Sequence, residues 1–105
     1  MSERACFVMR VRRDALDEYT RRHADVWPEM RAALTEAGWR NYSLYSVGDG
    51  MIVAYCEADD FQAALDAMQD KEVNSRWQAE MAPMFEIQVA PDSALERLPE
   101  IFHLD

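Results

Sequence analysis

The sequence predicts an α+β domain of the ferredoxin-like kind, with the element order β-α-β-β-α-β, one antiparallel sheet and helices on one face of that sheet. Three observations lead to this fold class. Apolar residues alternate near the start of the chain, a Gly-Asp-Gly turn joins two more strand-like segments, and helical periodicity fills the stretches between. The 105 residues fit a single domain over residues 1–105.

The first strand is expected at residues 5–11, where the side-chain period is two. Four apolar residues would share one face of it: Ala5, Phe7, Met9 and Val11. Asp14, shortly after this segment, is a residue type that favours the N-cap of a helix. A helix is therefore expected to begin next to Asp14.

One face of this first helix carries groups that can do chemistry. At about 100° per residue, Leu16, Tyr19 and His23 fall within roughly 60° of one another. The helix is expected to stop before Pro28, because the residue preceding a proline is driven out of helical geometry. Pro28 then opens a second helix, which Gly38 ends.

The middle of the chain predicts a hairpin of two strands, 41–47 and 51–57, joined by Gly48-Asp49-Gly50. The second of these strands is apolar at consecutive positions, so both of its faces are apolar. Helices can cover only one face of the sheet, and leaving the other in water is unfavourable. We therefore expect a homodimer whose sheets face each other, with a pocket between each sheet and its helices.

Two more helices and a final strand complete the expected order. Asp59 or Asp60 is expected to cap the third helix, and Pro83 is expected to end the fourth. The apolar stripes of these helices are Phe61, Ala64, Leu65 and Met68 in the third and Val73, Trp77 and Met81 in the fourth. A short last strand is expected at residues 101–104.

Charge and hydropathy exclude several classes of function. The net charge of −9 disfavours nucleic acid, anionic membranes and polyanionic substrates, although a local basic pocket would escape this argument. No apolar run approaches the ~20 residues that cross a bilayer, and the N-terminus lacks a signal-peptide pattern. A cytoplasmic protein is expected, in which Cys6 and Cys56 are reduced thiols.

Metal and cofactor signatures are missing from the sequence. The two cysteines and two histidines, His23 and His103, have no zinc spacing. Glycine-rich nucleotide motifs and a nucleophile elbow are also lacking. No metal and no cofactor are expected.

Tyr19, His23 and Trp27 form the most suggestive cluster, since they recur every four residues before Pro28. A histidine beside a tyrosine offers a proton carrier that works near neutral pH. The plainer interpretation makes His23 a boundary residue of the core and Trp77 a core residue at helical spacing. The pattern alone leaves both interpretations open.

Four motifs carry a resemblance to a known family. Residues 18–29 read EYTRRHADVWPE, residues 41–45 read NYSLY, Arg76-Trp77 lies in the late helix, and residues 101–104 read IFHL. With these motifs the chain resembles the L-rhamnose mutarotase family over essentially its whole length. The resemblance implies an isomerase that interconverts the α and β anomers of L-rhamnose. It also implies a dimeric α+β barrel that uses no cofactor.

The resemblance further implies the roles of particular residues. The family's catalytic histidine falls on His23, which would act as the general acid or base for ring opening and closure. The expected substrate-binding residues are Tyr19, Tyr42, Trp77, Gln78 and Trp27. Gln78 stands where the family often has a second tryptophan. The choice among L-rhamnose, L-fucose and L-lyxose, the proton that His23 moves and a second acid or base stay open.

Two other functions compete with the mutarotase. One is a cofactor-free monooxygenase of the dimeric α+β barrel class, which would place His23 or a tryptophan near a planar aromatic substrate. The other is a non-catalytic dimer that binds a small molecule, in which His23 is structural. Exchange between the anomeric NMR signals of L-rhamnose distinguishes the mutarotase from both.

Overall fold

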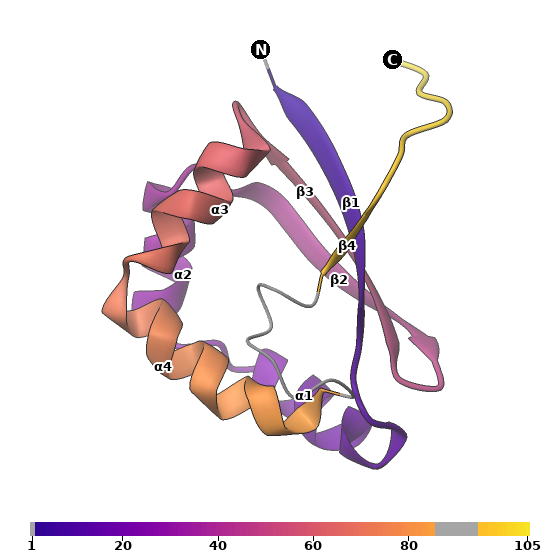
Figure 1. The fold of residues 1–105 in the computed structure, drawn as a ribbon, viewed down its shortest axis with the longest axis vertical. Coiled ribbons are helices and arrows are strands. Elements are labelled where there is room, and N and C mark those ends of the chain that lie inside the picture. The colour runs from indigo at the N-terminus through magenta and orange to yellow at the C-terminus, as the bar shows by residue number, and fades with distance from the viewer. Residues whose placement is uncertain (1, 86–94) are drawn as a thin grey trace.

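A four-stranded antiparallel sheet backs a layer of helices (Figure 1). The computed structural model describes residues 2–85 and 95–105. Their elements are β1 (Glu3–Arg10), the 3-10 helix η1 (Arg13–Ala15), α1 (Leu16–His23), α2 (Pro28–Glu36), β2 (Arg40–Gly48), β3 (Met51–Ala58), α3 (Phe61–Gln69), α4 (Glu72–Met81), the 3-10 helix η2 (Ala82–Met84) and β4 (Glu96–Leu98). The predicted order of elements is confirmed.

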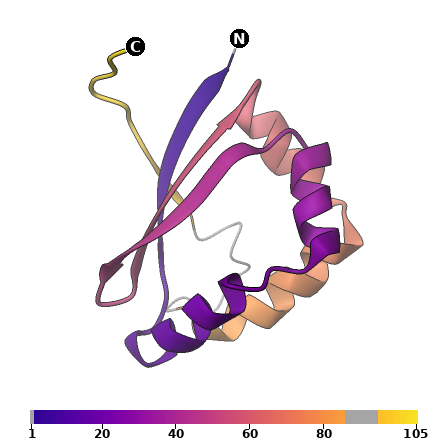
Figure 2. The same cartoon turned by 180° about the vertical axis from the view of Figure 1, so that it is seen from behind.

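The two most apolar strands occupy the centre of the sheet, whose order is β2-β3-β1-β4. The helices lie on one side of this sheet in both views (Figures 1 and 2). The side chains that face them are the buried ones of each central strand, such as Phe7 and Met9 on β1 and Ile52 and Ala54 on β3. Their burial removes apolar surface from water, which is the main favourable term in folding. The predicted apolar face of the first strand is thus confirmed.

The hairpin between β2 and β3 turns through Gly48, Asp49 and Gly50, all of which have positive φ. Gly50 is also approached closely by the chain that leaves β1. The backbone N–H of Val11 donates to the Gly50 carbonyl over 2.8 Å. A Cβ on Gly50 would lie 2.1 Å from the Val11 carbonyl oxygen. This contact ties the hairpin to the end of β1.

The start of the first helix differs from the sequence prediction. A 3-10 turn comes first, and Ala15 occupies the N-cap of α1 without a side-chain hydrogen bond. The predicted cap at Asp14 is therefore wrong, because Asp14 lies inside η1, where its carboxylate is 3.7 Å from the Arg12 guanidinium. At α3, Asp60 and not Asp59 is the cap, since its side chain accepts a hydrogen bond from the Ala63 N–H over 3.1 Å.

The break between α1 and α2 is made by Trp27 and Pro28. Trp27 is extended, with ψ of 135°, and Pro28 is the first residue of α2. The Trp27 carbonyl accepts from the backbone N–H groups of Met30 and Arg31, each over 3.0 Å, and so starts the new helix. Gly38, with φ of +97°, follows the end of α2. The predicted helix break and stop are confirmed.

The last strand is not where the sequence predicts it. Residues 101–104 form no strand and are exposed, so the prediction of a strand there is wrong. β4 lies earlier and pairs antiparallel with β1 through contacts such as Cys6 with Leu98. Its three residues are all exposed, so β4 is held by backbone pairing to the free edge of β1 and has no apolar pattern of its own. None of the helices in the described ranges is long and apolar enough to span a membrane.

Gly50→Ala should lower the free energy of unfolding by more than about 1 kcal/mol. A positive φ is strained for alanine, and the added Cβ would clash with the Val11 carbonyl oxygen. Gly48→Ala is the matched control, since Gly48 also has positive φ but has open space around the Cβ position. Urea unfolding should show a larger loss for Gly50→Ala. Equal losses would contradict the role given to the Val11 contact.

Candidate active site

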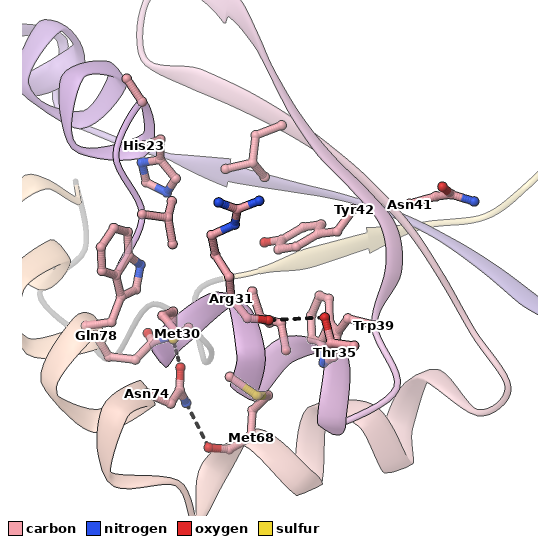
Figure 3. A pocket seen from close by; sticks show the side chains of 15 residues that line it. His23, Met30, Arg31, Thr35, Trp39, Asn41, Tyr42, Met68, Asn74 and Gln78 are labelled. Atoms are coloured by element: carbon pink, nitrogen blue, oxygen red, sulfur yellow. Dashed lines mark hydrogen bonds between the residues drawn. The ribbon is translucent and has the colours of Figure 1, made fainter. Parts of the chain in front are cut away.

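A cavity of about 730 Å³ lies between the sheet and the helices, as the sequence analysis expected. Its lining comes from the end of α1, from α2, from β2 and from α4 (Figure 3). A cavity of this size holds a small molecule, and its mixture of aromatic, amide and charged side chains is typical of a site for a polar ligand.

His23 lies at the C-terminal end of α1 and lines this cavity. Its Nδ1 is 2.8 Å from the backbone carbonyl oxygen of Tyr19. A carbonyl oxygen only accepts hydrogen bonds, so Nδ1 carries the proton and donates it. In the neutral ring, Nε2 is then the unprotonated nitrogen and has a lone pair for a ligand.

The imidazole of His23 is enclosed by two aromatic rings. The Tyr19 ring lies 4.3 Å away in a tilted arrangement, and Trp77 meets the imidazole edge-on at 5.4 Å. Burial lowers the pKa of His23 below its usual value of 6.5, partly opposed by the hydrogen bond to the Tyr19 carbonyl. His23 is therefore neutral at pH 7 and is suited to accept a proton through Nε2.

Tyr19 is more deeply buried than its proposed role in sugar binding suggests. Its side chain is 4% exposed, and burial raises the pKa of its hydroxyl to about 12. It lines a smaller cavity of about 60 Å³ that shares five residues with the larger one: His23, Trp39, Tyr42, Trp77 and Gln78. Tyr19 thus stays protonated and lies beneath the imidazole, while the shared residues connect the two cavities.

The structure brings most of the predicted site residues together. Tyr42 reaches the cavity from β2, while Trp77 and Gln78 reach it from α4. Trp27 is the exception, since it lines neither of these two cavities. Its ring meets Trp77 edge-on at 5.1 Å, and the Arg76 guanidinium lies 5.6 Å from its centre. Trp27 therefore packs against Trp77 without lining the cavity itself.

Several residues of the lining were not predicted as site residues by the sequence analysis, and three of them bear polar groups in notable places. Trp39 is buried, and its indole N–H donates to the Ala64 carbonyl over 3.1 Å. Asn74 is buried too, where it donates to the Met68 carbonyl over 3.0 Å and accepts from the Gln78 amide over 3.1 Å. Arg31 projects from α2 (Figure 3). Only the Gly38 helix stop, next to Trp39, gave any signal in the sequence.

Comparisons with known proteins decide the family. A family model described as L-rhamnose mutarotase matches residues 4–104. An L-rhamnose mutarotase of Ligilactobacillus salivarius is 38% identical over 109 residues, with 100% of each chain covered. One of Bacillus subtilis is 36% identical over 104 residues, covering 98% of this chain and 99% of the relative. The chain belongs to the L-rhamnose mutarotase family.

Solved structures confirm the predicted fold class. An L-rhamnose mutarotase from Formosa agariphila superposes with a TM-score of 0.79 at 24% identity, covering 98% of this chain and 99% of that one. A NIPSNAP family protein from Agrobacterium tumefaciens reaches a TM-score of 0.62 at 10% identity, covering 97% and 89%. These likenesses show the α+β fold alone.

Membership of the mutarotase family confirms the predicted enzyme class, an isomerase that interconverts the α and β anomers of L-rhamnose. The predicted mutarotase is therefore preferred over the monooxygenase and the non-catalytic dimer. In the described residues, no group of three or more His, Cys, Asp or Glu side chains is placed to hold a metal ion.

The His23 imidazole should titrate with a midpoint below 6.5 in NMR spectra of its ring protons, because burial disfavours the charged form. Trp77→Ala should move this midpoint upward toward 6.5, since water replaces the indole beside the ring. Trp27→Ala is the control, because Trp27 contacts Trp77 and should leave the His23 midpoint nearer the wild-type value. A wild-type midpoint at or above 6.5 would overturn the argument.

Proposed function

We propose that the 730 Å³ cavity is where the anomers of L-rhamnose exchange, with His23 as the general base. The observation that carries the proposal is the hydrogen bond from His23 Nδ1 to the Tyr19 carbonyl, which leaves Nε2 as the basic nitrogen. The lowered pKa keeps that nitrogen unprotonated at pH 7. The arrangement favours the base over the acid as the starting form of His23.

The chemistry needs only proton transfers. His23 Nε2 takes the proton of the anomeric hydroxyl, a C=O bond forms at C1, and the bond from C1 to the ring oxygen breaks. The ring oxygen gains a proton, for which water is a sufficient donor because mutarotation already proceeds in water. After rotation about the C1–C2 bond, the C5 hydroxyl attacks the other face of the carbonyl and gives its proton back to water, while His23 returns its proton to the anomeric oxygen.

The proposed binding residues divide between the two parts of a 6-deoxy sugar. Tyr42 and Gln78 offer hydrogen-bonding groups for the hydroxyls, while the Trp77 ring offers an apolar surface for the C–H faces and the methyl group. Tyr19 holds the imidazole through its carbonyl and its ring. Trp27 contributes through Trp77.

We further propose that two copies of the chain pack sheet to sheet. The helices cover one face of the sheet (Figure 2). On the other face, cross-strand pairs place Val8 beside Val53 and Val53 beside Tyr45, which is 60% exposed. Three residues of the C-terminal segment, Ile101, Phe102 and Leu104, are also exposed. A second copy would remove this apolar surface from water.

We also propose that each subunit is a single domain over residues 1–105 and that the protein acts in the cytoplasm. The free thiols of Cys6 and Cys56 support the second of these, because free cysteines are typical of a reducing compartment.

His23→Asn should lower the rate of anomer exchange by about 10²-fold or more while changing the affinity for L-rhamnose only a few-fold. The wild-type rate should be constant near neutral pH and fall as the pH drops through a pKa below 6.5, because protonation removes the base. Saturation-transfer NMR on the anomeric protons measures both. His103→Asn, in the exposed C-terminal segment, is the matched control and should exchange like the wild type. A folded His23→Asn variant with the wild-type rate would make His23 structural.

Light scattering should return the mass of a dimer at micromolar concentration. Val53→Glu should shift the protein toward the monomer, because it places a carboxylate in the middle of the proposed apolar interface. Gln62→Glu, on the exposed side of α3, adds the same charge elsewhere and should leave the mass unchanged. A monomeric wild type, or a Val53→Glu variant that stays dimeric, would contradict sheet-to-sheet packing.

A further inference from the structure

The cavity contains a positive charge that no carboxylate of the described residues neutralises. Arg31 extends from α2, and its guanidinium points into the cavity toward the part of the lining that carries His23 and Tyr42 (Figure 3). Apart from Arg31 and Arg10, every arginine in residues 2–85 and 95–105 forms an ion pair with a carboxylate there. Arg10 lies at the end of β1 and is not part of the cavity lining.

The rest of the described lining does not offset this charge. The chain has 20 acidic residues, yet no Asp or Glu is among the described residues that line the cavity. His23 is neutral at pH 7, and, apart from Arg31, the other polar side chains of the described lining carry hydroxyls, amides or indole N–H groups, all of them uncharged. A described lining with one cation and no anion favours negatively charged ligands, even in an acidic protein. This is the local basic pocket that the net charge alone does not exclude.

A carboxylate is the group that suits a guanidinium best. The planar guanidinium donates two parallel N–H···O bonds to the two oxygens of a carboxylate. In an aldopyranose, the carbon that carries a carboxylate without disturbing the hydroxyls or the anomeric centre is C6. L-rhamnose has a methyl group at that position, and a hexuronic acid has the carboxylate.

We propose that the cavity accepts hexuronic acids as a second class of substrate, with Arg31 binding the C6 carboxylate. The inference rests on the proposed function, because His23 performs the same proton transfers at C1 of either sugar. C5 and the ring oxygen separate C6 from C1, so an ion pair at C6 leaves the anomeric hydroxyl accessible to His23. No bond to the carboxylate forms or breaks during the exchange.

Three sugars that differ only at C6 test this proposal: L-rhamnose with a methyl group, L-mannose with a hydroxymethyl group and L-mannuronate with a carboxylate. Anomer exchange of each is followed by NMR at pH 7 and low salt. The wild type should exchange L-mannuronate with a kcat/KM at least equal to that for L-mannose. Added salt should lower the value for L-mannuronate alone, because it screens the ion pair.

The readout for Arg31 is the ratio of kcat/KM for L-mannuronate to that for L-mannose. Arg31→Met should lower this ratio about tenfold, as expected for the loss of a charge-assisted hydrogen-bonding pair. Arg31→Lys should restore part of it, since lysine keeps the charge but loses the planar fork. Arg13→Met removes an exposed arginine outside the cavity lining and should leave the ratio unchanged.

Two results would overturn the inference and leave the proposed function intact. One is a wild type that exchanges L-rhamnose but does not accelerate exchange of L-mannuronate. The other is an Arg31→Met variant that changes both kcat/KM values by the same factor. Failure of the wild type to exchange L-rhamnose would instead contradict the proposed function and the inference together. The ratio is independent of the amount of folded enzyme, so partial unfolding of a variant does not affect it.

Discussion

The break between α1 and α2 is the constraint on which the site depends. A helix that continued through residues 24–27 would keep α1 and α2 on one axis, whereas Pro28 drives Trp27 out of helical geometry and begins a second helix. As a result, His23 at the end of α1 and Arg31 in α2 both reach one cavity. The carbonyl of Trp27 stabilises the start of α2, because it accepts hydrogen bonds from two backbone N–H groups of the first turn.

Local sequence patterns predicted those parts of the molecule whose structure is set locally. The period of two in β1 and β3 marks the central strands, and the face shared by Tyr19 and His23 follows from helix geometry. β4 was misplaced because its three exposed residues pair through backbone groups that no side-chain pattern reveals, while the apolar residues 101–104 imitate a strand. Arg31 and Asn74 were missed because only the packing of α2 and α4 against each other turns them toward one cavity.

The acidic charge of the chain and the burial of the candidate site have opposite effects on the pKa of a histidine. The surface is strongly acidic, but the described lining of the cavity contains no carboxylate. A carboxylate beside His23 would favour the imidazolium and raise its pKa, whereas burial without such a partner lowers it. The absence of an acidic neighbour in the described lining thus maintains the free base at neutral pH. Mutarotation needs only a modest acceleration, and one positioned base supplies about 10²–10⁴-fold.

Trp77 belongs both to the packed interior and to the wall of the cavity. Its side chain is only 7% exposed, and its ring packs against Trp27, as a core residue would. The same ring covers the edge of the His23 imidazole and forms part of the cavity wall. The packing that holds α4 against α1 is therefore also the packing that buries the His23 imidazole. Because burial lowers the pKa of His23, a substitution at Trp77 should change both the stability of the protein and the protonation of the imidazole.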